Sequence, residues 1–204
     1  MLLSCYAGRC AKKTLPVAMD LRALASAGHE VLAAGRHGLL MERRQGRWRR
    51  LDLGPAAAGK DLLALWHGAH GTYVAGDKGL LMRREEQRWV PLTSNTQAAI
   101  TSLWGNEEQL YAAAGDALLR CSAKACEKLT TLPVGTISNF WGIPSKEGRA
   151  FLVLSHEGAL HRFTQGRWSR ERVGFAGRLL ALWGRQGHVW AVGEKGAILH
   201  RLPR

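Results

Sequence analysis

Four cysteines are spaced so that they could form two disulfide bonds. Four residues separate Cys5 from Cys10, and four separate Cys121 from Cys126. In a tight hairpin this spacing sets two cysteines opposite each other at a distance that a disulfide can span. We therefore expect the disulfides Cys5–Cys10 and Cys121–Cys126, in preference to free thiols. Because such bonds do not persist in a reducing cytosol, they predict an exported or cell-surface protein; the alternative is a cytoplasmic subunit of a complex.

Other groups that could bind a metal or carry catalysis are scattered. His67 and His70 lack a third ligand nearby in sequence, and the two cysteine pairs belong to separate hairpins, which argues against one zinc site. The few acidic residues fall mostly in expected turns, and the chain has no Gly-x-Ser-x-Gly, P-loop or His-Glu-x-x-His motif. We expect no cofactor, no metal and no enzymatic activity. A hydrolase or lyase is a minor alternative that would need paired acids in a central channel. The first strands of the repeats described below offer few candidates for that channel: Ala23, Leu24, Ala64, Leu65, Ser102, Leu103, Asn139, Phe140, Ala181 and Leu182.

Basic residues outnumber acidic ones, with 29 Lys and Arg against 16 Asp and Glu and a net charge of +13. Many arginines recur near the ends of the repeats described below: Arg43, Arg44, Arg47, Arg49, Arg50, Arg83, Arg84, Arg88, Arg162, Arg167, Arg170 and Arg172. A basic rim of this kind would attract the phosphate or sulfate groups of nucleic acid or acidic polysaccharide. The alternative interpretation is a solvated sheet edge whose charges prevent edge-to-edge aggregation.

The elements that must position these residues come from an internal repeat. The segments Leu62 to Leu92 and Leu179 to Leu202 share a Leu-Trp opening, an apolar run, Gly-x-x-Gly and a second apolar run. The same frame recurs at Leu21 to Leu53, Ile100 to Pro133 and Ile137 to Val173. Each repeat alternates in short strands and contains no amphipathic helix, which is typical of a propeller blade.

The repeat predicts an all-β fold, a β-propeller of five four-stranded blades that form one domain. The blades are expected at 21–53, 62–93, 100–133, 137–173 and 179–203, the last together with 2–16. The segment Leu2 to Pro16 aligns with Leu118 to Pro133, an outer hairpin, so we expect it to supply the outer strand that the last repeat lacks. One strand is then surplus, because both Leu2 to Ser4 and Ala197 to Arg201 resemble a third strand.

Tryptophans recur at one position of the first strand in four repeats: Trp66, Trp104, Trp141 and Trp183, with Ala25 in the remaining one. Aromatic rings at equivalent positions could form a ligand-binding ring. Packing between neighbouring blades is the interpretation we favour, since large aromatic side chains dominate such interfaces.

The frame formed by Leu182 to Gly184 and Val189 to His200 resembles repeats of bacterial exported propeller proteins. It is distantly similar to the photosystem II stability and assembly factor propellers and to sialidase-type repeats. The Ser-x-Asp-x-Gly-x-Thr-Trp box of sialidase-type blades and the Gly-His and Trp-Asp signatures of WD40 blades are absent. The resemblance implies a propeller fold and a role in binding or assembly.

Together these features predict a non-catalytic interaction or scaffold protein that binds a protein partner through its turn-rich face. Binding of a polyanion through the arginine-rich rim is the alternative. No stretch reaches the roughly 20 apolar residues of a membrane-spanning helix.

Overall fold

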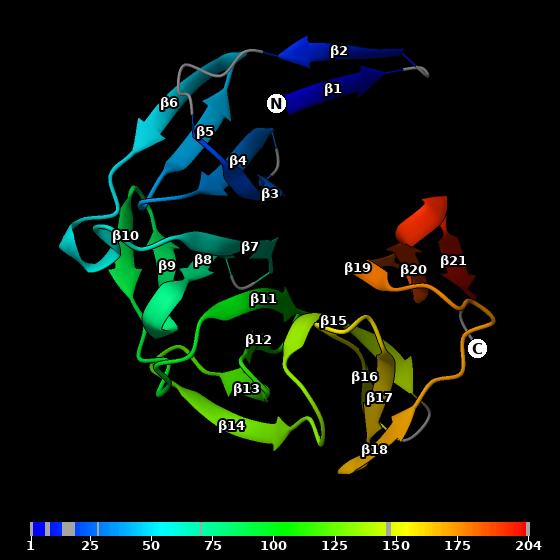
Figure 1. Cartoon of the computed structure of the whole chain (residues 1–204). Helices are drawn as coiled ribbons and strands as arrows, with labels where there is room; N and C mark the ends of the chain where they lie inside the picture. Colours follow the sequence, from blue (N-terminus) through cyan, green and yellow to red (C-terminus); the bar gives the residue numbers. More distant parts are fainter. Residues whose placement is uncertain are drawn as a thin grey trace.

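The computed structural model describes almost the whole chain, namely residues 2–6, 9–13, 19–27, 29–69, 71–145 and 148–202. It is an all-β structure in which five antiparallel sheets follow one another around a ring (Figure 1). The predicted five-bladed β-propeller is therefore confirmed.

Each of the first four blades is a four-stranded sheet whose strands pair in chain order. The strands are β3 (Leu21–Ala27), β4 (Glu30–Gly35), β5 (Leu40–Arg44) and β6 (Arg47–Leu51) in the first blade; β7 (Leu62–Gly68), β8 (Gly71–Gly76), β9 (Leu81–Glu85) and β10 (Arg88–Pro91) in the second; β11 (Ile100–Gly105), β12 (Leu110–Ala114), β13 (Ala117–Cys121) and β14 (Cys126–Thr131) in the third; and β15 (Ile137–Ser145), β16 (Gly148–Ser155), β17 (Leu160–Thr164) and β18 (Arg167–Arg170) in the fourth.

The fifth blade contains β19 (Leu179–Arg185), β20 (His188–Gly193) and β21 (Ile198–Arg201), paired in that order. The N-terminal segment forms its own two-stranded sheet from β1 (Leu2–Tyr6) and β2 (Arg9–Lys13). In Figure 1 this hairpin lies beyond β5 and β6, on the side of the ring where the first and last blades face each other. We expected the N-terminal segment to add an outer strand to the fifth blade, and this prediction is wrong: in the described residues, neither β1 nor β2 pairs with β21.

The predicted relation between the two cysteine hairpins is confirmed by their strand registers. Cys5 stands opposite Cys10 in the β1–β2 pair, as Cys121 stands opposite Cys126 in the β13–β14 pair. The hairpin is self-contained because β1 already provides β2 with a partner strand, and this pairing replaces the closure that we expected.

The core lies between the blades. Successive side chains of a strand point to opposite faces of the sheet, so they pack against the blades on its two sides in turn. Val74 of β8 packs with the first blade, whereas Tyr73 and Ala75 pack with the third. Four inter-blade clusters of this kind hold the five blades together. The repeat of short apolar runs in the sequence is the signature of these two-sided sheets.

Short turns between the second and third strands of the blades carry the repeated glycines. Gly79 adopts a φ of +67°, in the left-handed region that favours glycine. Gly76 is extended instead, and an added Cβ there would collide with the carbonyl oxygen of Asp61. The first glycine of the motif is thus required for close backbone approach and the second for its dihedral angle. The short 3-10 helices η2 (Asp77–Gly79) and η3 (Glu194–Gly196) form such turns, whereas η1 (Pro55–Ala57) joins the first blade to the second.

Candidate functional site

The inner strands of the blades, β3, β7, β11, β15 and β19, line the central channel and contact one another in that order. Each has a bulge after its first residue, where the register with the second strand shifts by one. A bulge re-aims the side chain that it inserts. Three of the inserted residues, Arg22, Leu63 and Thr101, line the channel cavity.

The cavity in this channel has a volume of about 600 Å³, within the range of about 300–1,000 Å³ of small-ligand sites. Its aromatic wall is formed by Trp66, Trp141 and Trp183. The ring centroids of Trp66 and Trp141 are 6.1 Å apart, and those of Trp141 and Trp183 are 6.4 Å apart. Trp183 keeps 56% of its surface exposed. One end of the channel therefore offers a partly exposed aromatic surface.

Trp66, Trp104 and Trp141 also pack between blades, as the interpretation that we favoured requires. A Cβ at Gly142 would collide with the ring of Trp104, and one at Gly105 would lie 3.0 Å from Nε1 of Trp66. Trp141 covers Gly184 in the same way. The indole of each of these three tryptophans therefore packs against a glycine of the next blade, the one that directly follows that blade's own tryptophan. Packing between blades is the main role of Trp104, whereas Trp66 and Trp141 combine packing with lining the cavity.

Two of the polar side chains that line this cavity are bonded within the chain. His67 shares a hydrogen bond of 2.9 Å between its Nδ1 and Oγ1 of Thr72. The Thr101 hydroxyl donates to the carbonyl oxygen of Ile137 at 3.0 Å. Asn139 differs, because its Oδ1 is buried and accepts no hydrogen bond from the described residues. A buried acceptor without a donor is costly, so Asn139 marks a position where a ligand N–H or a water would be favoured.

Sequence reasoning identified part of this lining. Seven of the ten residues that we expected at the channel from the first strands line the cavity: Ala23, Leu24, Ala64, Leu65, Ser102, Leu103 and Asn139. The other three, Phe140, Ala181 and Leu182, are not among its lining residues. Sequence reasoning missed Arg22, Ser26, Leu63, His67 and Thr101, and it assigned Trp66, Trp141 and Trp183 mainly to packing between blades. The bulge explains why Arg22 and Thr101 were missed, because strict alternation places their side chains on the face that points away from the channel. No Asp or Glu is among the described lining residues.

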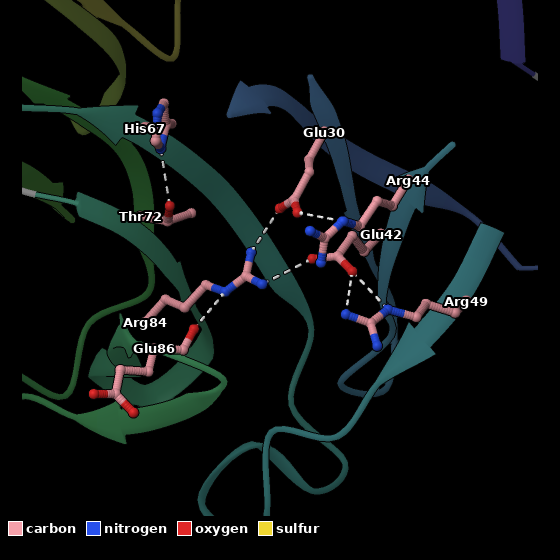
Figure 2. Close-up of polar contacts among 8 residues, drawn as sticks. All are labelled: Glu30, Glu42, Arg44, Arg49, His67, Thr72, Arg84 and Glu86. Atoms are coloured by element: carbon pink, nitrogen blue, oxygen red, sulfur yellow. Dashed lines mark hydrogen bonds and ion pairs between the residues drawn. The ribbon is translucent and has the colours of Figure 1, made fainter. Parts of the chain in front are cut away.

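Five of the twelve rim arginines pair with carboxylates of the chain itself: Arg44, Arg49, Arg83, Arg84 and Arg162. Three of these arginines, Arg44, Arg49 and Arg84, form one network with Glu30 and Glu42 between the first and second blades (Figure 2). Arg84 reaches across the blade boundary to Oε2 of Glu30 and Oε1 of Glu42, each at 3.0 Å. Glu42 is fully buried and also contacts Arg49, whose Nε donates to Oε2 at 2.6 Å.

The network has an electrostatic consequence for Glu30. Burial alone would raise the pKa of this carboxyl, but the hydrogen bond and charge of Arg84, with Arg44 nearby, hold the pKa of Glu30 below its usual value. Arg84 therefore joins the second blade to the first through its ion pairs with Glu30 and Glu42. Sequence reasoning missed this role, although Glu42 gave a signal: it is a carboxylate directly after the apolar run Leu39–Leu40–Met41.

The other seven rim arginines form no ion pair with the described residues: Arg43, Arg47, Arg50, Arg88, Arg167, Arg170 and Arg172. They lie on or beside β5, β6, β10 and β18, in the first, second and fourth blades. The outer strand of the third blade, β14, interrupts the rim with Glu127, which pairs with Arg120. The unpaired arginines thus form two separate groups.

The structure describes one predicted cysteine pair in full and the other in part. Cys121 and Cys126 form a disulfide that is almost fully buried. Cys10 is disulfide-bonded as well, but the side chain of its expected partner Cys5 lies outside the described residues. His70 also lies outside them. Within the described ranges there is no cluster of three or more metal-ligating side chains, and no helix there could span a membrane.

Comparisons with known proteins show the fold and no closer relationship. No family model and no curated protein matches the sequence. Among solved structures, YCF48 bound to D1 peptide aligns with a TM-score of 0.68 at 16% identity, over 93% of this chain and 65% of that one. The predicted resemblance to photosystem II assembly-factor propellers is confirmed at the level of the fold.

Two further structures extend this comparison. The extracellular domain of the one-component system BT4673 from B. thetaiotaomicron has a TM-score of 0.74 at 12% identity, covering 95% of this chain and 29% of that one. The WD40 propeller domain of Doa1 has a TM-score of 0.68 at 12% identity, covering 90% and 65% of the two chains. The chain thus spans about two thirds or less of the length of these neighbours.

Proposed function

We propose that this protein is a non-catalytic interaction module that binds a protein partner at the tryptophan-lined end of its central channel. The observation that carries the proposal is the cavity of about 600 Å³ in which exposed Trp183 lies beside Trp141 and Trp66. Tryptophan is enriched among the residues that dominate protein–protein binding energy. The site lies on a rigid scaffold of inner strands, so little ordering would oppose binding.

The chemistry of the cavity favours an apolar or aromatic group with one hydrogen-bond donor. The indole rings of Trp66, Trp141 and Trp183 would cover the apolar part, and Oδ1 of Asn139 would accept from a partner N–H. Arg22 adds a positive charge at the wall. A peptide loop or side chain that combines these features fits the site, and the neighbour solved with a bound peptide supports a role of this kind.

The absence of carboxylates from the described lining supports a binding role in preference to acid–base catalysis. A hydrolase on this fold would need convergent acidic groups in the channel. Incubation with chromogenic glycoside, ester and polysaccharide substrates, followed over hours, is the corresponding check, and turnover would contradict the non-catalytic proposal.

The proposal can be tested with peptides selected from a random displayed library on the purified protein. Selected peptides should bind the wild type and lose about tenfold or more in affinity to Trp183→Ala. Arg167→Ala is the matched control, because Arg167 is exposed on the outer strand β18. Peptides that bind Trp183→Ala as well as the wild type, or a library that yields none, would contradict the channel site.

A polyanion role for the rim is the second candidate, supported by the seven arginines without an internal carboxylate partner. Such binding would weaken steeply between about 50 and 200 mM salt, since each phosphate contact releases counterions. Heparin and duplex DNA should then bind at low salt and fail to bind a variant in which Arg47, Arg50 and Arg88 are changed to Gln. Binding that is indifferent to salt, or unaffected in this variant, would exclude the rim.

We further propose that the protein is exported. The buried disulfide Cys121–Cys126 supports this location, as do the extracellular-domain propellers among its structural neighbours.

A further inference from the structure

Arg22 is a cation in the wall of the central channel without a counter-charge in the part of the chain that the structure describes. Its exposed side chain lines the cavity from β3 and forms no ion pair with a described carboxylate. From this arrangement we infer that the protein partner presents an acidic side chain to Arg22, while an apolar or aromatic side chain of the same segment packs on the tryptophans. The inference rests on the channel site proposed above and specifies the partner of that site.

The bulge of β3 holds Arg22 in this place. The register between β3 and β4 shifts between Leu21 and Ala23, so Arg22 is the inserted residue. The residues inserted at the equivalent bulges of the second and third blades, Leu63 and Thr101, line the cavity as well. A bulge re-aims a side chain through the backbone of its strand. The guanidinium is therefore presented by a paired strand, and little backbone ordering would oppose binding.

The surroundings leave the charge of Arg22 uncompensated. Thr101 donates its hydroxyl to the carbonyl oxygen of Ile137 at 3.0 Å, and the buried Oδ1 of Asn139 is a neutral acceptor. A cation between low-dielectric walls focuses its field and attracts an anion, and the net charge of +13 adds long-range attraction. A guanidinium can bind one carboxylate through two parallel N–H···O bonds. An acidic side chain therefore matches Arg22 in charge and in geometry.

The repeat sets the spacing between this charge and the aromatic surface. Arg22 comes three residues before Ala25, which holds the position of Trp66 in the second blade and of Trp141 in the fourth. Three residues of a strand span about 10 Å. An extended partner segment would cover that distance with its acidic residue and its apolar residue about three positions apart. The spacing can be read directly from peptides that bind the site.

A single-stranded nucleic acid is the competing occupant, because its bases could stack on the indoles and a phosphate could meet Arg22. Proteins bind such strands through a groove of positive charge that follows the backbone. The described lining of this cavity holds one arginine and no lysine. One guanidinium matches one carboxylate better than a row of phosphates, which favours the protein partner.

The test uses peptides selected on the purified protein from a random displayed library and then synthesised. We expect Asp or Glu about three positions from Trp, Phe or Leu in the selected sequences. Arg22→Gln should weaken their binding about tenfold, and Arg22→Lys should restore part of the loss. Lys128→Gln is the matched control, because it removes one positive charge from an exposed position of the outer strand β14. This variant should bind the peptides as the wild type does.

The acidic residue of a selected peptide provides the second half of a double-mutant cycle. Its change to the corresponding amide should weaken binding to the wild type about tenfold and should leave binding to Arg22→Gln unchanged, since the two changes remove the same interaction. A local distortion caused by Arg22→Gln would not produce this coupling. Independent effects of the two changes would therefore overturn the inference.

The remaining outcomes separate this inference from the channel site on which it rests. Peptides that lose affinity for Trp183→Ala but bind Arg22→Gln as tightly as the wild type would overturn the inference and leave the channel site standing. Peptides that depend on Arg22 and not on Trp183 would support the acidic contact and contradict the aromatic site. Selected sequences without an acidic residue would overturn the inference. So would binding of oligo-dT that weakens about tenfold in both Arg22→Gln and Trp183→Ala, because the anion would then be a phosphate.

Discussion

The indole of Trp104 occupies the space that a side chain on Gly142 would need, across the boundary between the third and fourth blades. The pairs Trp66 with Gly105 and Trp141 with Gly184 repeat this relationship. Where the chain has Ala25 at the tryptophan position, the following blade has His67 at the glycine position. The two positions therefore vary together along the chain, as steric complementarity requires.

Gly142→Ala should destabilise the protein by about 1–3 kcal/mol, because the added methyl group overpacks the interface with Trp104. Gly174→Ala is the control, since a Cβ there meets no atom within 4 Å. Urea denaturation followed by tryptophan fluorescence measures both. Equal stability of the two variants would show that the interface can relax.

Arg84→Ala should lower the free energy of unfolding by about 3 kcal/mol, because it leaves the buried carboxylate of Glu42 without one of its two cations. Arg88→Ala, in the next strand, removes an exposed arginine and should change stability by less than about 0.5 kcal/mol. Thermal and chemical unfolding would compare them. A loss in Arg84→Ala no larger than in the control would mean that Arg49 alone satisfies Glu42.

Acid should weaken the boundary between the first two blades. The folded-state pKa of Glu30 lies below its unfolded value, which is about 4.3. Its contribution to stability is therefore present above about pH 4.3 and is lost as the pH falls through the folded-state pKa. Unfolding midpoints measured from pH 7 to pH 3 should fall less steeply in Glu30→Gln than in the wild type. A slope that is the same in both would rule out Glu30 as a source of the acid sensitivity.

The disulfides can be counted in protein isolated from its native host. Alkylation before and after reduction, read by mass spectrometry, should show no free thiol before reduction and four after it. Replacing Cys121 and Cys126 together by Ala should cost about 2 kcal/mol, since the bond closes only a short loop. Four free thiols in the native material would contradict export and direct attention to an intracellular complex.

How much of this protein follows from its sequence can be judged from particular elements. The period of the Leu-Trp frame and the alternation within it determined the blades and their strands, because both are local properties of one repeat. The match between Leu2 to Pro16 and Leu118 to Pro133 likewise predicted the shared register of the two cysteine hairpins, and the structure confirms it. Strand pairing across a tight turn needs no information from distant residues.

Only the tertiary structure decided which distant residues meet. The contact of Arg84 with Glu30 and Glu42 joins positions 54 and 42 residues apart, so no local pattern reveals it, and some arginines assigned to a basic rim prove to be internal partners. The bulges that turn Arg22 and Thr101 into the channel shift the alternation that sequence reasoning relies on. The pairing of the N-terminal hairpin was equally undetermined, since β1 and β21 are similar strands that compete for the same partner. The tertiary structure pairs β2 with β1, the strand nearest in sequence, for which loop closure costs the least entropy.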